Sequence, residues 1–427
     1  MKKNQIFIKC GTEYKEMTKE LLEACDLAGE IEKKFEKCGL KVLSENSGAG
    51  LQQNSEKIIT EAKFETKSSL IDNSEAEVDC FYSSDSVEKQ NSEFGLYNMR
   101  IGIKPNLVAP MEAYWGGTTH PEVVAGIVEY LQEKGFSKLV IMEGSWVGDS
   151  TPAAFRAAGY DRISRQYGVE LKDLQADTWK TYDAAGMDIR LCDSAAEVDF
   201  MINMPVLKGH CQTTVTCALK NNKGVIPNSE KRRFHTMGLH KPIAHLNTVA
   251  RNDFILVDNI CGDLDFEEGG NPVVMNRILA FLDPVLCDSF VCESMGYSPE
   301  EVEYITRAEQ LGVGSMDTSS ANVVYLNEDL SDKSKFHMTG RVKKLASYTD
   351  GRDACSACFG SLIYALDRLQ DRGELKKGLP PVAIGQGYKG QSGDIGVGQC
   401  TSCFAKSLKG CPPRALDMVE FLEKEWL

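Results

Sequence analysis

The sequence lacks the features that carry proteins into or across membranes. Its first ten residues contain no long apolar segment of the signal-peptide type, and no uncharged run approaches the ~18 apolar residues that a spanning helix needs. Basic residues are also fewer than acidic ones: the chain has 48 Lys and Arg and 62 Asp and Glu, which gives a net charge of -14. Such a charge repels phosphate backbones and anionic membrane surfaces. We therefore expect a cytoplasmic protein that binds neither nucleic acid nor membranes.

A dinucleotide-binding fingerprint is also lacking. The spacing Gly-x-Gly-x-x-Gly occurs at residues 385–390, but it leads into more loop instead of opening a helix. Histidine is scarce as well, with six residues in the chain and none after His337. The chemistry of the C-terminal region must therefore depend on other side chains.

Apolar segments and helical patterns alternate along the chain and predict an α/β fold. Strands are expected at 5–10, 99–103, 138–142, 200–204, 254–257 and 381–384, and helices at 16–35, 120–134, 153–168, 275–282, 358–369 and 413–425. This alternation is typical of a largely parallel sheet with helices on both faces, here in two α/β lobes. In such sheets ligands bind at the carboxyl ends of the strands.

Composition divides the chain into four parts. Residues 1–43 are interpreted as an N-terminal βα element, 96–330 as the α/β core, and 331–427 as a C-terminal α/β segment that carries cysteines. The part between the first two, 44–95, is rich in Ser, Asn, Gln, Glu and Lys and poor in aliphatic residues. It offers too little apolar surface to offset the entropy of ordering, so we expect a variable insertion.

Fifteen cysteines without a secretion signal indicate reduced thiols and not a disulfide framework. Ten are scattered, and we expect them to be small buried apolar residues. The other five form two Cys-x-x-Cys pairs and a Cys-Pro: Cys355, Cys358, Cys400, Cys403 and Cys411. Two such pairs are a strong signal for a bound metal.

Four cysteines can hold either a zinc ion or an iron-sulfur cluster. The lack of histidine in the tail, the proline after Cys411 and the glycines around the thiols favour a 4Fe-4S cluster, with zinc as the alternative. Five thiols exceed the four iron corners of a cubane cluster. Cys403 is the expected spare.

Positive charge is concentrated between residues 208 and 245, where seven cationic residues and four of the six histidines accompany a single acid. Such a concentration in an acidic protein would attract a small anionic ligand; the alternative is a solvated loop that pairs with the acidic surface. The candidate catalytic residues are Lys208, His210 and His235. The candidate substrate-binding residues are Lys104, Asn106, His120, Lys220, Asn221, Lys223 and Asp258.

Several stretches resemble the domain of unknown function 362 (DUF 362), an uncharacterised family often described as iron-sulfur-associated. They are residues 103–108, 118–124, 198–210, 213–224, 234–235 and 283–288, within a resemblance that covers about residues 96–315. The cysteine pairs and the Gly-Cys-Pro-Pro element are similar to those of members with a cluster-bearing end. Val206 and Gly209 stand where the family has Lys and Thr. The resemblance implies no particular activity, and these departures allow a different substrate.

Three functions remain open. The first and favoured one is a redox enzyme or electron-transfer protein, in which a cluster serves a small anionic ligand or a redox partner protein at the cationic site. The second is a non-redox lyase or isomerase, with Lys208, His210 and a carboxylate in acid-base roles beside a structural or Lewis-acid cluster. The third is a zinc-stabilised binding module.

Overall fold

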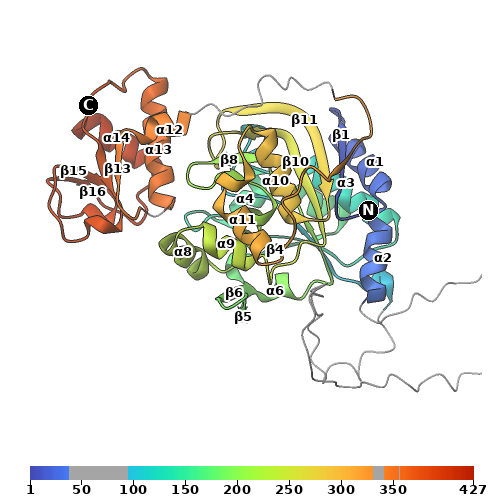
Figure 1. The fold of residues 1–427 in the computed structure, drawn as a ribbon. Coiled ribbons are helices and arrows are strands. Elements are labelled where there is room, and N and C mark those ends of the chain that lie inside the picture. Colours follow the sequence, from blue (N-terminus) through green and yellow to red (C-terminus); the bar gives the residue numbers. More distant parts are fainter. Residues whose placement is uncertain (38–94, 330–340, 355) are drawn as a thin grey trace, which may run out of the picture.

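A computed structural model describes residues 1–37, 95–329, 341–354 and 356–427 (Figure 1). Cys355 and the expected insertion at 44–95, apart from its last residue, lie outside the described residues. None of the helices within the described ranges is both long enough and apolar enough to cross a membrane.

The core is built on an eight-stranded sheet. Its pairs are parallel except for those that β11 makes with its two neighbours, β1 and β10. In spatial order the strands are β12 (Asn322–Tyr325), β1 (Gln5–Cys10), β11 (Pro272–Phe281), β10 (Phe254–Asp263), β7 (Phe200–Asn203), β2 (Ile101–Lys104), β3 (Leu139–Glu143) and β4 (Glu170–Asp173).

Helices cover both faces of this sheet, so the side chains of its central strands are buried on both sides. Ile255 and Val257 of β10 pack into one apolar cluster, and Phe254 and Leu256 pack into the other. The first cluster is completed by α8 (Asn228–Met237), α9 (His240–Leu246), α10 (Pro284–Ser294) and α11 (Glu303–Gln310). The second is completed by α1 (Tyr14–Cys25), α2 (Leu27–Lys37), α3 (Pro121–Glu133), α4 (Thr151–Ala157) and α5 (Tyr160–Tyr167). The expected α/β fold with a mostly parallel sheet is confirmed.

Three expected helices differ in the structure. The helix expected at 275–282 is wrong, because these residues lie in β11, where they pair with strands on both sides. The helix expected at 16–35 is interrupted at Asp26, which has φ 53°. The helix expected at 153–168 is likewise interrupted at Gly159, with φ 81°. Left-handed backbone at these two positions ends one helix before the next begins.

Short elements shape the carboxyl end of the sheet. β8 (Lys208–His210) and β9 (Thr214–Thr216) form an antiparallel ribbon, which leads into α7 (Ala218–Asn221). A second ribbon, β5 (Trp179–Asp183) with β6 (Asp188–Cys192), precedes α6 (Asp193–Ala196).

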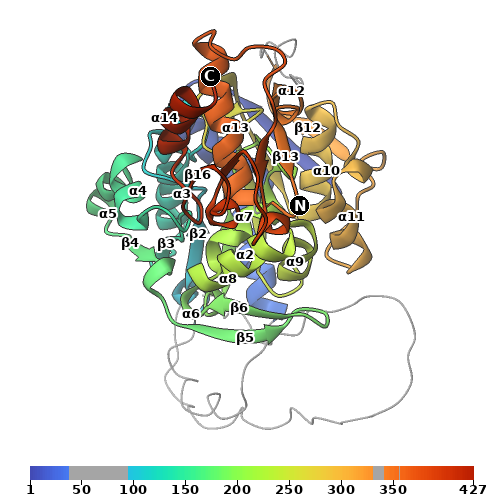
Figure 2. The same ribbon diagram turned by 90° about the vertical axis from the view of Figure 1, so that its left-hand side faces the viewer.

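Residues 341–354 and 356–427 form a separate lobe, here called the cysteine module, which lies beside the core in Figure 1 and in front of it in Figure 2. Four parallel strands follow one another in sequence order: β13 (Thr349–Gly351), β14 (Val382–Ile384), β15 (Ile395–Val397) and β16 (Lys406–Leu408). The helices are α12 (Arg341–Ala346), α13 (Ser356–Asp371) and α14 (Ala415–Glu425). Apolar side chains of α13 and α14 pack against the strands in a third cluster.

The cysteine module touches the core close to β8. Gln212 Nε2 donates to the carbonyl oxygen of Ala354 at 3.3 Å. Phe266, at the tip of the β10–β11 hairpin, is 2 % exposed and belongs to the apolar cluster of the module. The two lobes therefore share packing as well as a hydrogen bond.

Candidate functional site

The site lies where β7, β2 and β3 end side by side. Lys104 ends β2 in register with Asn203 of β7, and Glu143 ends β3. Lys104 Nζ donates to Glu143 Oε2 at 2.9 Å and to Asn221 Oδ1 at 3.2 Å. Both charged side chains are buried. The strand ends thus place a water-shielded ion pair where sheets of this class bind ligands.

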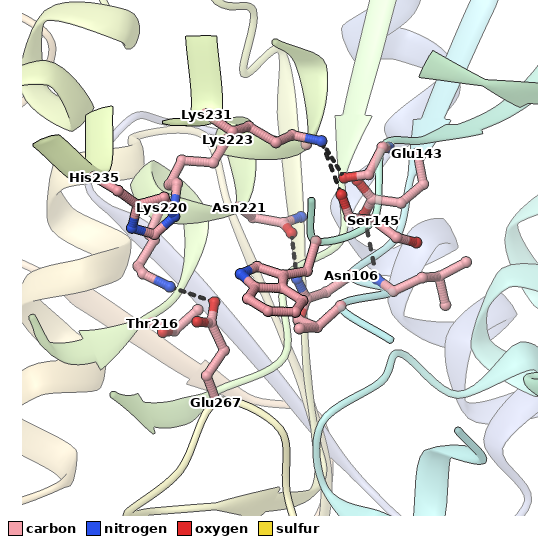
Figure 3. Close-up of a pocket in the computed structure, with 15 residues that line it drawn as sticks. Asn106, Glu143, Ser145, Thr216, Lys220, Asn221, Lys223, Lys231, His235 and Glu267 are labelled. Carbon is pink, nitrogen blue, oxygen red and sulfur yellow. Dashed lines mark hydrogen bonds and ion pairs between the residues drawn. The ribbon is translucent and has the colours of Figure 1, made fainter. Parts of the chain in front are cut away.

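A pocket opens beside this ion pair (Figure 3). Its volume of about 50 Å³ holds a few water molecules or one small anionic group. Five residues expected from the sequence to take part in a site line it together: Asn106, Lys220, Asn221, Lys223 and His235. They come from the loop after β2, from α7 and the turn that follows it, and from α8.

Three buried polar atoms on the pocket wall have no hydrogen-bond partner among the described residues. They are Asn106 Oδ1, Ser145 Oγ and Thr216 Oγ1. An unpaired buried polar group costs about 1–3 kcal/mol. The pocket is therefore suited to a polar occupant that supplies the missing hydrogen bonds.

Glu267 closes one side of the pocket through two basic partners. Its carboxylate forms a short ion pair with Lys220, and Oε2 lies 3.1 Å from Nε2 of His210. Nδ1 of His210 accepts the backbone N–H groups of Gln212 and Thr213 at 3.1 and 3.0 Å, so the proton is on Nε2. Burial and the charge of Lys220 lower the pKa of His210 to about 4. With both ring nitrogens engaged, His210 is placed to hold Glu267 and not to accept a proton.

Two glycines allow the tip of the hairpin to reach this position. A Cβ atom on Gly209 would lie 2.0 Å from the carbonyl oxygen of Leu264, and one on Gly262 would lie 2.0 Å from that of Leu207. Only glycine permits so close an approach of two backbones. The glycine at position 209 therefore matches the packing of the β10–β11 hairpin over β8.

Two further lysines surround the pocket with lowered pKa values. Lys223 Nζ lies 3.4 Å from His235 Nε2, and burial together with the charge of Lys220 lowers the pKa of Lys223 to about 7. Lys231 Nζ donates to the carbonyl oxygens of Gly144 and Ser145 at 2.8 and 2.9 Å, and burial lowers its pKa to about 8. A lysine with a pKa near 7 is partly neutral at neutral pH, so it can accept a proton or act as a nucleophile.

Five of the ten expected site residues are not part of the pocket lining: Lys104, His120, Lys208, His210 and Asp258. Lys208 is fully buried and donates to the carbonyl oxygen of Gly117 at 2.7 Å. His120 and Asp258 pair with each other, with Nδ1 and Oδ2 2.8 Å apart. Lys104 stands directly behind the wall through its bond to Asn221.

The sequence reasoning did not select three charged residues of the pocket: Glu143, Lys231 and Glu267. A signal existed for each of them. Glu143 directly follows a predicted strand, Lys231 belongs to the cationic segment, and Glu267 belongs to an acidic stretch after β10. Their pairing partners are distant in the sequence, so the pattern alone did not place them in one pocket.

The tail cysteines gather at the carboxyl edge of the cysteine module's sheet. Cys400 follows β15 and Cys411 follows β16; the residues just before them are joined by a 2.7 Å bond from Gln399 N to Gly410 O. Cys358 lies in the first turn of α13, and its Sγ is 3.4 Å from the place of a Cβ on Gly398. Cys403 is exposed in the turn after Cys400.

Four of the tail thiols lie within the described residues: Cys358, Cys400, Cys403 and Cys411. Around a tetrahedral zinc ion, thiolate sulfurs lie about 3.8 Å apart. In the part of the chain that the structure describes, no three of the tail thiols have sulfurs within 4.8 Å of one another. A cubane cluster spreads its thiolates over separate iron corners, which requires wider spacing. The tail residues that the structure describes can supply thiolates to either group.

A second group of potential ligands lies deep in the core. Cys217 and Cys287 have sulfurs 3.8 Å apart, and with Asp288 they form the one set of three within 4.8 Å among the described side chains. Asp288 accepts the hydroxyl of Tyr304 at 3.0 Å and the backbone N–H of Leu219, which lies in the first turn of α7. Burial raises the pKa of Asp288 to about 7. These contacts explain the group as a support for α7.

Comparison with known proteins agrees with part of these expectations. A sequence model of the family described as "Domain of unknown function (DUF362)" matches residues 101–293, within the 96–315 expected. The thylakoid-associated protein sll1697 of Synechocystis sp. is 24% identical over 232 residues, which are 50% of this chain and 68% of that protein.

Among solved structures, the lactate racemase apoprotein from Thermoanaerobacterium thermosaccharolyticum aligns with 12% identity and a TM-score of 0.29. The alignment covers 49% of this chain and 48% of the racemase, about half of each. A likeness at this level carries no information on activity.

Proposed function

We propose that this chain is an iron-sulfur enzyme that acts on a small anionic substrate in the pocket at the strand ends. One observation carries the proposal. Phe266 packs into the apolar cluster of the cysteine module, and the next residue, Glu267, binds Lys220 and His210 at the pocket. Two neighbouring residues of one hairpin, Phe266 and Glu267, thus connect the cysteine module with the cationic pocket.

Substrate binding is assigned to the pocket lining. Lys220 and Lys223 supply positive charge for a carboxylate or phosphate group, and a charge-assisted hydrogen bond to such a group is worth about 1.5–3 kcal/mol. Asn106, Ser145 and Thr216 offer the polar atoms that lack partners. Lys223 is the candidate acid-base group, since its lowered pKa leaves part of its amine neutral at neutral pH.

The cluster is assigned to Cys355, Cys358, Cys400 and Cys411, with Cys403 as the exposed spare. When bound, a 4Fe-4S cluster supplies one-electron transfer. Gln212 lies two residues from His210 and donates to Ala354, the neighbour of Cys355, so the proposed ligand loop adjoins the wall of the pocket. A redox partner protein is the expected source of electrons in this proposal, and zinc is the alternative occupant of the cysteines.

Lys223 also favours a second candidate, a non-redox lyase or isomerase. A lysine with a pKa of about 7 can remove a proton from an anionic substrate without any electron transfer. The cysteine module would then be structural. The two candidates share the pocket and differ in the role of the tail.

Anaerobic purification tests the proposal and separates the candidates. Iron, sulfide and zinc are quantified, and the dithionite-reduced protein is examined by EPR. Iron and sulfide with a reducible cluster signal support the redox enzyme, and a cluster that resists reduction supports the lyase or isomerase. A colourless protein that contains zinc alone would overturn the assignment of a cluster.

Lys223 is expected to be methylated by formaldehyde and cyanoborohydride at about pH 7 at least ~10-fold faster than Lys241. The reason is that the neutral amine is the reactive form, and Lys241 is an exposed lysine on α9. Both rates are read from the same protein by peptide mass spectrometry, so Lys241 serves as the internal control. The rate at Lys223 should level off above about pH 7, the lowered pKa of this lysine. Equal rates with the same pH dependence would contradict a neutral Lys223.

A further inference from the structure

Three side chains outside the pocket, those of Cys261, His120 and Asp258, contact one another in this order next to the N-terminus of α3. Cys261 Sγ lies 3.8 Å from His120 Nε2, and His120 Nδ1 lies 2.8 Å from Asp258 Oδ2. His120 immediately precedes α3, whereas Cys261 and Asp258 both belong to β10. A thiol, an imidazole and a carboxylate in this order are the arrangement of enzymes with a cysteine nucleophile.

The surrounding contacts fix the orientation of the imidazole. Asp258 is fully buried; Oδ2 also accepts the backbone N–H of His120 at 2.7 Å, and Oδ1 accepts that of Ile260 at 3.0 Å. The ring of Tyr14 from α1 meets the imidazole edge-on at 5.5 Å. Asp258 thus holds Nδ1, which leaves Nε2 directed at Cys261.

The charges around His120 favour its protonated form. Burial acts against this form, but the charge and hydrogen bond of Asp258, with a contribution from Cys261, raise the pKa of His120 to about 10. The titratable groups that face this centre are Asp258 and Cys261 from β10, Tyr14 from α1 and Glu122 from α3. An imidazolium next to a thiol stabilises the thiolate, which is the reactive form of cysteine.

We propose that Cys261 is a second reactive centre, a thiolate nucleophile that takes up small acyl groups from thioesters or activated esters. In this step Sγ forms a bond to the acyl carbon, and the bond from that carbon to the leaving thiolate or alkoxide breaks. His120 gives its proton to the leaving group. Asp258 positions His120 throughout. None of the three residues lines the pocket of the proposed function, so this inference does not depend on it.

The turn over Cys261 limits what can reach it. Cys261 is 4 % exposed, and its Sγ lies 3.5 Å from the carbonyl oxygen of Ala113. The next two side chains of this turn, Tyr114 and Trp115, stack on each other and are 59 % and 48 % exposed, and the turn is held by backbone hydrogen bonds from Gly270 N to Trp115 O and from Asp263 N to Gly116 O. Access therefore requires a shift of this turn, which favours groups of about acetyl size.

The test uses the full-length protein with p-nitrophenyl acetate as the probe and maps acetylated cysteines by peptide mass spectrometry. At about pH 6 we expect Cys261 to be acetylated ahead of every other described cysteine, because ordinary thiols ionise only near pH 8.5. Cys25 and Cys192 are the matched buried controls, since burial raises the pKa of each to about 12. The proposal is overturned if Cys261 reacts no faster than Cys25 and Cys192.

Two variants assign the roles. Cys261→Ser should abolish the fast release of nitrophenolate. His120→Gln keeps a donor for Asp258 but cannot carry a charge, and it should lower the rate at Cys261 by about 100-fold at pH ~6, because the positive charge that favours a neighbouring thiolate is lost. An unchanged pH profile in His120→Gln would refute the role of His120. Should that variant not fold, the pH profile of Cys261 in the parent protein decides, because an ordinary profile refutes the proposal by itself.

Discussion

Lys104→Ala is expected to lower the free energy of unfolding of the core by about 3–5 kcal/mol. Lys104 and Glu143 form an ion pair in which both side chains are buried, with Nζ and Oε2 2.9 Å apart. Glu143 also accepts the backbone N–H groups of Gly144 and Leu107, so its carboxylate cannot turn toward solvent. Removal of the lysine alone therefore leaves a buried charge without its partner. Urea denaturation followed by tryptophan fluorescence measures the loss.

The matched control is the double variant Lys104→Met/Glu143→Gln. It removes both charges at nearly constant volume, and the glutamine oxygen can still accept a backbone N–H. We expect it to be clearly more stable than Lys104→Ala, since replacing both partners of a buried pair is often neutral. A loss below about 1 kcal/mol in Lys104→Ala would mean that the pair contributes little to stability.

Serine substitutions in the tail are expected to separate the proposed cluster ligands from the spare thiol. Each of Cys355→Ser, Cys358→Ser and Cys411→Ser removes one thiolate corner, so the iron content should fall to near zero. Cys403→Ser should retain most of the iron, because a cubane cluster has four iron corners and Cys403 is the expected fifth thiol. Cys400→Ser should lose more iron than Cys403→Ser.

Iron and sulfide are measured after anaerobic purification of the parent and all five single variants. Cys403→Ser is the internal control, since it changes the same atom in the same lobe. The ligand assignment fails if Cys403→Ser loses as much iron as Cys411→Ser. Equal iron in every variant and in the parent would exclude a cluster held by this tail.

The sequence predicted the core sheet well where strands are short and apolar. β2, β3 and β7 are buried along their whole length, so composition alone identifies them. It failed for β11, whose residues Met275, Ile278 and Leu279 also suit the spacing of a helix. Pairing with β1 and β10 decides in favour of a strand, and this information is not local.

The sequence predicted part of the candidate site, namely the residues that lie close together in the chain. The local concentration of positive charge identified Lys220, Asn221 and Lys223, because these residues lie close together in the sequence. All three line the pocket. The partners of the site were not visible, because the bond between Lys220 and Glu267 joins residues 47 positions apart. The contact between Cys261 and His120 spans 141 positions and leaves no local pattern.

The β10–β11 hairpin sets a length requirement on this chain. Asp258 and Cys261 lie within its first strand, and Phe266 and Glu267 lie just beyond that strand at the tip. Side chains alternate along a strand, so one inserted or deleted residue between Cys261 and Phe266 would shift the tip relative to the root. Homologues should therefore tolerate gaps in their outer loops but not in this interval. The count of residues across it is a simple criterion for deciding which homologues can carry both centres.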